Sequence, residues 1–206
     1  MADGFGARGA PLSSAAVGAI AALDAPVPAG ELLNALADAV HRAGAVVADD
    51  LAAHPADGCT GTTLTALVLS GSRLGLVHVG DARVYLLRGG ALFRITHDHT
   101  VVQGMIAEGR LTEEEARSHP QRALLVRALH GRAVDPDLAL HDALPGDRYL
   151  LATDGLHAVV PEDAIRDALV GAPDPGEATG RLVDLVTGGG APDNVVCVVA
   201  DVVAAA

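Results

Sequence analysis

The stretch LLATDGLHAVV, residues 150–160, runs an apolar strand pattern directly into an Asp-Gly pair. A carboxylate at the end of a buried strand is costly unless it is solvated or neutralised. Taken singly, an Asp-Gly pair is a common turn former. The pattern recurs, however, because an aspartate stands between an apolar run and a Gly- or Pro-marked turn in ADGFG, HVGDAR, ATDGL and GAPDNV, at Asp3, Asp81, Asp154 and Asp193.

Strand ends on one rim of a sheet can converge, and carboxylates that converge repel one another. A bound divalent cation is the usual way to relieve that repulsion. All four candidates offer oxygen ligands, and no His or Cys residues accompany them in zinc-like spacing. Oxygen ligands favour hard ions. The pattern therefore predicts Mg²⁺ or Mn²⁺ and disfavours zinc.

Composition narrows the class of protein. A chain of 206 residues, half of them hydrophobic, suits one domain with a substantial core. The net charge of −12 disfavours nucleic acid and anionic membrane as partners, because phosphate binding needs clustered basic residues. The two cysteines, Cys59 and Cys197, predict reduced thiols in or near the core and a cytoplasmic location. The apolar run at 15–23 is too short to span a bilayer.

Hydrophobic periodicity predicts the elements and, from the residues alone, an α+β fold with a sheet core. Helices are expected at 11–24, 31–54, 161–170 and 177–187, and a charged, broken helical excursion at 100–129. The four strands at 62–70, 73–80, 82–88 and 91–96 are expected to form one antiparallel meander, and further strands at 138–143, 148–153 and 194–203.

The motifs in their order resemble a known family. ADGFG, HVGDARVYLLR, THDHT, LTEEEARSHP, GDRYLLATDGL and GAPDNVVCVV together resemble the bacterial form of the PPM-type (type 2C) metal-dependent protein serine/threonine phosphatases. The resemblance extends from the first residues to the end of the chain. It implies an α+β fold in which an antiparallel β-sandwich is flanked by helices on both sides, in α-β-β-α layers. It also implies a single PPM-type phosphatase domain over residues 1–206.

The resemblance assigns a role to each aspartate. Asp3 matches the family residue that touches two metal ions, and Gly4 matches the glycine that lends its backbone carbonyl. Asp154 matches the carboxylate of the second Asp-Gly motif, and Asp193 matches that of the Pro-Asp-Asn motif. Asp81 matches a carboxylate associated with a third, weaker metal. The implied cofactors are therefore two Mg²⁺ or Mn²⁺ ions, with a third bound more weakly.

The implied reaction is hydrolysis of phosphoserine or phosphothreonine esters. In this family a metal-bound water is the nucleophile, so neither a phosphoenzyme nor a catalytic side chain beyond the metal ligands is expected. The implied partners are phosphorylated proteins, the targets of Ser/Thr kinases, and neither nucleic acid nor membrane is expected. The sequence leaves the oligomeric state open. Residues 100–130 match the family's variable flap region, which lies beside the site, but nothing in them indicates a particular substrate, and a solvated helical insertion is the alternative.

Two departures from the family pattern concern the start of the chain. Family members usually carry further strands before the first Asp-Gly motif, with an arginine for the substrate phosphate and an acidic metal ligand. Because Met1 stands two residues before Asp3, we expect an amino-terminally truncated domain that lacks those strands, and we hypothesise a true start upstream. The run FGAR, residues 5–8, replaces a Gly-Gly-His run. Arg8 is thus a candidate phosphate ligand, with a solvated surface arginine as the alternative.

Two other functions stay open at this point. A catalytically impaired pseudophosphatase that binds phosphoproteins as a regulatory module is favoured by the missing strands, whereas the retained Asp3, Asp154 and Asp193 favour the enzyme. An unrelated Mg²⁺ phosphohydrolase with an aspartate nucleophile would need an Asp-x-Asp pair after its first strand. ADGFG offers no such pair.

Overall fold

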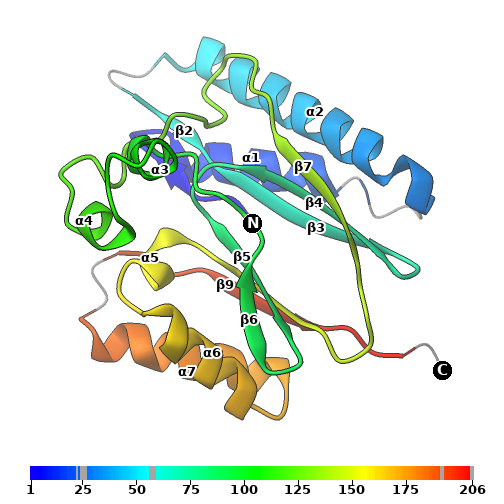
Figure 1. The fold of residues 1–206 in the computed structure, drawn as a ribbon. Helices are drawn as coiled ribbons and strands as arrows, with labels where there is room; N and C mark the ends of the chain where they lie inside the picture. Colours follow the sequence, from blue (N-terminus) through cyan, green and yellow to red (C-terminus); the bar gives the residue numbers. More distant parts are fainter. Residues whose placement is uncertain (22, 24–26, 56–58, 191–192, 205–206) are drawn as a thin grey trace. The chain divides into compact units, whose positions relative to one another are not determined.

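The computed structural model describes residues 1–21, 23, 27–55, 59–190 and 193–204. The chain divides into two compact units. The first unit consists of Met1–Ala82 and His99–Asp142, and the second of Arg83–Asp98 and Ala143–Ala206. Each unit holds its own antiparallel sheet and its own helices (Figure 1). The α+β class expected from the sequence is confirmed.

The first unit is built on a three-stranded sheet in the order β3-β4-β7. These strands are β3 (Leu64–Ser70), β4 (Arg73–Val79) and β7 (Asp137–Asp142). β3 and β4 form a tight hairpin, in which Leu64 lies opposite Val79. A shorter pair, β1 (Gly4–Phe5) and β2 (Gly61–Thr62), continues from the amino-terminal end of β3.

Two helices cover this sheet, α1 (Gly9–Ala21) and α2 (Leu32–Ala53), with a short 3-10 turn, η1 (Ala29–Glu31), before α2 (Figure 1). α2 is amphipathic because apolar residues recur every three or four positions on one face. That face packs with α1 and the strands in one core that includes Leu12, Leu36, Val40, Val47, Leu64 and Val77. The two predicted helices are confirmed, although the expected end of the first, at Asp24, lies outside the described residues.

The excursion after His99 contains two short helices, α3 (Val101–Ala107) and α4 (Glu113–Arg117). Thr100 caps α3 by accepting a hydrogen bond from the Gln103 amide. α4 begins with a capping box, in which Thr112 and Glu115 satisfy each other's free amides. The short capped helix expected from LTEEEARSH is confirmed, and the remainder of residues 100–129 is mostly turn.

The second unit carries a four-stranded sheet in the order β6-β5-β8-β9. Its helices α6 and α7 pack against this sheet around a core that includes Tyr85, Leu150, Ile165, Leu169, Leu182 and Val186. The bounds are β5 (Arg83–Arg88), β6 (Ala91–Arg94), β8 (Arg148–Ala152), β9 (Cys197–Asp201), α5 (Asp154–His157), α6 (Glu162–Gly171) and α7 (Pro175–Gly188). Within the described ranges, every helix is too short or too polar to traverse a bilayer.

The structure corrects the expected meander. The four strands from 62 to 96 do not form one sheet, because β3 and β4 belong to the first unit whereas β5 and β6 belong to the second. β4 pairs with β7, and β5 pairs with β8. The break falls at Gly80, whose positive φ of 117° turns the chain out of β4. Both cysteines are free as expected, but Cys59 is exposed and not in the core.

Candidate metal centre

The first predicted ligand, Asp3, is fixed by its backbone to Thr62 and Thr63, where β2 leads into β3. Its amide donates to the Thr63 hydroxyl over 3.0 Å, and its carbonyl accepts from the Thr63 amide over 2.8 Å. The Thr62 hydroxyl also donates to that carbonyl. Both threonines are almost fully buried. The Thr-Thr pair at the start of the β3 region therefore sets the position of Asp3.

Gly4, the second predicted ligand, lies where two backbones cross. A Cβ at Gly4 would overlap the carbonyl of Gly9, and a Cβ at Gly9 would lie within 2.7 Å of the Gly4 carbonyl oxygen. Glycine is required at both positions because no side chain fits between the two segments. The close approach fixes the loop between β1 and α1, and with it the Gly4 carbonyl.

Asp81 belongs to the turn that leaves β4. The preceding residue, Gly80, lies against Thr63, so that a Cβ at Gly80 would lie 2.5 Å from the Thr63 Cβ. Thr63 thus contacts the Asp3 segment through hydrogen bonds and the Asp81 turn through packing. The structure brings these two predicted segments together within the first unit.

Asp154 and Asp193 come together within the second unit. Asp154 is the first residue of α5 and is separated from β8 by Thr153 alone. A Cβ at Gly155 would overlap the Asn194 carbonyl oxygen, so the second Asp-Gly motif packs directly on the Pro-Asp-Asn motif. The Thr153 amide donates to the Val196 carbonyl over 3.0 Å, and the Val196 amide donates to the Thr153 hydroxyl over 3.1 Å. These bonds hold the two motifs side by side.

The electrostatics of this pair suit a cation. Burial raises the pKa of Asp154, and the charge of Asp193 raises it further, with a smaller contribution from Asp98. A site that disfavours the ionised carboxylate in this way favours any cation that neutralises it. Among the described residues, no group of three or more His, Cys, Asp or Glu side chains is arranged to hold a metal. Mg²⁺ needs no such group, because it keeps several waters and takes one or two carboxylates.

Known proteins resemble this chain over nearly its whole length. The sequence profile of the family described as Protein phosphatase 2C matches residues 5–104. The serine/threonine protein phosphatase PstP of Mycobacterium tuberculosis (strain H37Rv) is 48% identical over 205 residues, which are 98% of this chain and 40% of that protein. The crystal structure of the M. tuberculosis phosphatase PstP/Ppp matches with a TM-score of 0.94 and 47% identity, over 98% of this chain and 87% of that one.

The chain belongs to the protein phosphatase 2C family. The crystal structure of the PstP catalytic domain in complex with two manganese ions also matches the chain, with a TM-score of 0.91 and 45% identity over 98% of this chain and 86% of that one. The phosphatase MsPP of Mycobacterium smegmatis matches with a TM-score of 0.86 and 38% identity, over 97% and 85% of the two chains. The chain spans about 40% of the length of the curated relative PstP.

Arg8 of this phosphatase-family chain makes a forked ion pair. Its Nη2 lies 2.6 and 2.8 Å from the two carboxylate oxygens of Asp50 in α2, and its Nε lies 3.2 Å from one of them. Its amide also donates to the Thr60 hydroxyl. A contact between Arg8 and a substrate phosphate stays a prediction, and it would have to compete with Asp50.

We expect Arg8→Ala to lower the free energy of unfolding by about 1 kcal/mol, because both partners are only about one-quarter exposed. Asp50→Ala should cost a similar amount, and the double variant should cost less than the sum. Urea unfolding of the four proteins measures this coupling. A phosphate contact would in addition raise the KM for a phosphopeptide in Arg8→Ala, whereas an unchanged KM would exclude that role.

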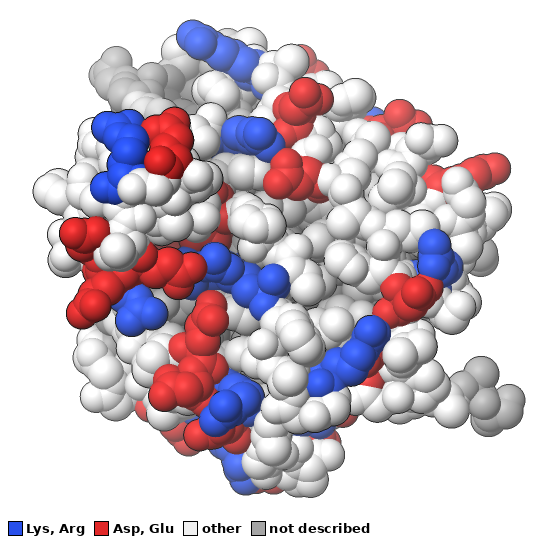
Figure 2. Space-filling model, viewed as in Figure 1, with Lys and Arg blue, Asp and Glu red and all other residues white. Residues whose placement is uncertain are grey.

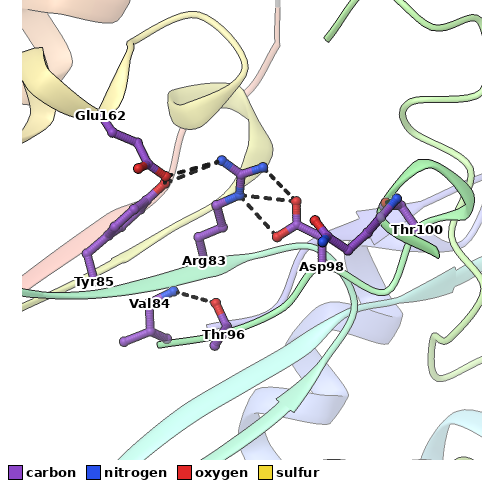
Figure 3. A network of polar contacts seen from close by, with 8 residues as sticks. Arg83, Val84, Tyr85, Thr96, Asp98, Thr100 and Glu162 are labelled. Atoms are coloured by element: carbon purple, nitrogen blue, oxygen red, sulfur yellow. Dashed lines mark hydrogen bonds and ion pairs between the residues drawn. The ribbon is translucent and has the colours of Figure 1, made fainter. Parts of the chain in front are cut away.

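A further acidic group near Asp154 is not evident from the sequence motifs. Asp98, in THDHT, is only 9% exposed and is held by Arg83 of β5 through a fork with distances of 2.7, 3.0 and 3.1 Å (Figure 3). Burial alone would raise the pKa of Asp98, but the hydrogen bonds and charge of Arg83 lower it. Arg83 also faces the Tyr85 hydroxyl, which donates to Glu162. The signal was present in the sequence as an arginine and an aspartate at opposite ends of a hairpin.

We expect Arg83→Met to destabilise the protein by about 3–5 kcal/mol, because it leaves a buried carboxylate uncompensated. The double variant Arg83→Met, Asp98→Asn should recover much of that loss. Because the pKa of Asp98 is lowered by folding, the pair's contribution is complete above the unfolded-state pKa, about 3.9, and is lost as pH falls below it. Thermal melts between pH 2 and 7 test this, since the double variant should lose less stability in acid than wild type.

Arginines elsewhere in the chain are also compensated locally. Figure 2 shows acidic and basic side chains interleaved on the face that it displays. At least nine of the 14 basic residues form ion pairs with Asp or Glu: Arg8, Arg73, Arg83, Arg88, Arg110, Arg127, Arg148, Arg166 and Arg181. Guanidinium groups that are already engaged are poor candidates for binding a substrate phosphate.

Proposed function

We propose that this chain is a metal-dependent protein serine/threonine phosphatase that hydrolyses phosphoserine and phosphothreonine esters. The observation that carries the proposal is the packing of Gly155 on Asn194, which sets Asp154 beside Asp193 and raises the pKa of Asp154. The similarity to PstP, whose catalytic domain was crystallised with two manganese ions, supports it.

The described residues fit the proposed ions. The donors are all oxygens, and Asp154 is in surroundings that disfavour its charge unless a cation is near. By the family pattern, Asp3, the Gly4 carbonyl, Asp154 and Asp193 would hold two Mg²⁺ or Mn²⁺ ions, and Asp81 would serve a third, weaker one. When bound, such ions neutralise the phosphoryl oxygens and acidify the water that attacks phosphorus in line.

The protein's own part in this reaction is placement. The Thr62–Thr63 bonds hold Asp3, and the Thr153–Val196 bonds hold the strand end before Asp154. Rigid backbone at these points keeps the carboxylates oriented before substrate arrives, which lowers the reorganisation needed during reaction. No side chain is proposed as a nucleophile, because the proposed catalytic residues are the metal ligands alone.

The proposed substrates are phosphoproteins made by Ser/Thr kinases, since the relatives are protein phosphatases. We further propose that residues 1–206 act as one phosphatase domain, which the alignment of 98% of the chain with the catalytic domain of PstP supports. The free thiols of Cys59 and Cys197 suit the reducing cytoplasm as the proposed location.

Hydrolysis of an aryl phosphate and of a phosphothreonine peptide tests the function, first with Mn²⁺ and then with excess chelator. Turnover that requires Mn²⁺ is the expected result. Binding of Mn²⁺ and phosphopeptide without turnover would replace the proposal by the phosphoprotein-binding pseudophosphatase. A covalent phosphoaspartate trapped by rapid acid quench would replace it by the aspartate-nucleophile mechanism.

A further inference from the structure

His99 is almost completely buried, and the proposed mechanism gives it no task. It is 6% exposed and bonds to the turn that carries Asp81. The Gly80 amide donates to the His99 ring Nδ1 over 3.1 Å, and the His99 amide donates to the Gly80 carbonyl over 2.8 Å. A single residue thus satisfies both the donor and the acceptor of the residue before Asp81.

These contacts define the protonation of the ring. Because the Gly80 amide can only donate, Nδ1 accepts, and a neutral ring bonded in this way carries its proton on Nε2. Nε2 lies 3.1 Å from Asp137 Oδ2, so its proton points at a carboxylate. Arg127 Nη1 donates to the other oxygen, Oδ1, over 2.7 Å, and it also lies 3.2 Å from Nε2 itself, so that in this tautomer its hydrogen bond goes to Asp137 and not to the ring. Burial acts to raise the pKa of Asp137, but the hydrogen bonds from His99 and Arg127 lower it.

The surroundings leave the ring little freedom to turn. It lies against the ring of His78, with 4.8 Å between the centroids. His78 Nδ1 is in turn 2.9 Å from the Thr65 hydroxyl, and His78 is paired in register with Asp137 on β7. The chain of contacts therefore runs from Arg127 through Asp137 and His99 to the Gly80 peptide, and every member belongs to the first unit.

We propose that His99 is a positioning residue that fixes the Gly80–Asp81 turn and so presents the Asp81 carboxylate to a divalent cation. Asp137, held by Arg127, fixes the tautomer in which Nδ1 accepts from Gly80. Outer partners that orient metal ligands in this way commonly change metal affinity by 10- to 100-fold when they are replaced. The inference rests on the proposed function only in assigning Asp81 to a cation.

Two substitutions separate the two ends of the ring. His99→Asn keeps an acceptor near the position of Nδ1 but cannot reach Asp137, whereas His99→Gln reaches toward Asp137 and loses the acceptor for Gly80. In wild type, the long-range ¹H–¹⁵N spectrum should show His99 with Nδ1 unprotonated and Nε2 protonated. We expect the Gly80 amide to exchange with solvent about tenfold faster in His99→Gln, because about one hydrogen bond is lost. In His99→Asn the amide should exchange near the wild-type rate.

Calorimetric titration with Mn²⁺ supplies a second readout on the full chain. His99→Gln should weaken the weakest Mn²⁺ binding step by about tenfold, and His99→Asn should restore most of it. In an Asp81→Asn background, His99→Gln should have no further effect on Mn²⁺ binding, because the two act through one site. His141→Asn, the same change at a half-buried histidine on β7, is the matched control and should bind Mn²⁺ as wild type does.

Three results would overturn the inference. The first is a ring protonated at Nδ1, and the second is an unchanged Gly80 exchange rate in His99→Gln. The third is that both His99 variants lose Mn²⁺ affinity and melting temperature equally, because equal losses would indicate a merely structural role. If wild type fails to hydrolyse either phosphate ester while the spectrum, the exchange rates and the Mn²⁺ titrations turn out as expected, the proposed function fails and the positioning role stands.

Discussion

Asp154→Asn should reduce Mn²⁺-dependent hydrolysis by about 10³-fold or more, and it should leave the metal-free protein as stable as wild type or more so. The loss is expected because removing the carboxylate forfeits several kcal/mol of charge stabilisation by a bound ion. The stability follows from the pKa of Asp154, which folding raises. A raised pKa means that this group favours folding only while it is protonated, so its contribution disappears as pH rises through the folded-state pKa.

At neutral pH the ionised Asp154 therefore opposes folding of the metal-free protein, and asparagine removes that opposition. Aryl phosphate kinetics and thermal melts with and without Mn²⁺ check both halves of the prediction. Mn²⁺ should raise the melting temperature of wild type much more than that of the variant. Asp184→Asn, the same change at an exposed position of α7, should leave both readouts unchanged. Activity within tenfold of wild type in Asp154→Asn would contradict the assigned ligand.

Gly155→Ala should reduce activity by about 100-fold, because a displacement of reacting groups by about 1 Å is enough for such a loss. The added Cβ overlaps the Asn194 carbonyl oxygen, so the second Asp-Gly motif and the Pro-Asp-Asn motif must move apart. That movement separates Asp154 from Asp193 without removing either carboxylate. The variant should also melt at a lower temperature, since the clash is with backbone and not with a flexible side chain.

Gly180→Ala is the matched control, since a Cβ at Gly180 in α7 meets nothing within 4 Å. An added methyl group there should stabilise the helix by about 0.5–1 kcal/mol and leave kcat/KM unchanged. Steady-state kinetics, Mn²⁺ affinity and melting temperature of the two variants form the measurement. Wild-type Mn²⁺ affinity in Gly155→Ala would show that the contact with Asn194 does not set the spacing of the two carboxylates.

Much of the fold could be predicted from the sequence because its elements are strongly periodic. The apolar spacing of α2 and the Gly-Gly turn between β5 and β6 are local signals, and both elements are present as expected. Sheet membership is not local. β4 and β5 are adjacent in the chain yet belong to different sheets, because their partners β7 and β8 arrive more than 50 residues later. Periodicity carries no information about which distant strand completes a pair.

For the site, the sequence identified the aspartates but not what holds them. The Asp-Gly and Pro-Asp-Asn motifs predict Asp154 and Asp193 as ligands. The proximity of these two residues depends on a backbone contact at Gly155 that only the structure reveals. The Arg83–Asp98 pair and the ring of His99 were missed because each joins residues from different elements. For Arg8, the sequence shows the charged side chain but not that Asp50 is its ion-pair partner.

The Arg83–Asp98 pair also has a topological meaning. Arg83 is the first residue and Asp98 the last of the segment by which the chain enters the second unit and leaves it again. Their ion pair joins the two ends of this segment. The turn of the segment is at Gly89 and Gly90, where a Cβ would meet nothing within 4 Å. The tip of the hairpin lies at the other end of β5 and β6 from this ion pair, which makes it the natural place to graft a reporter peptide.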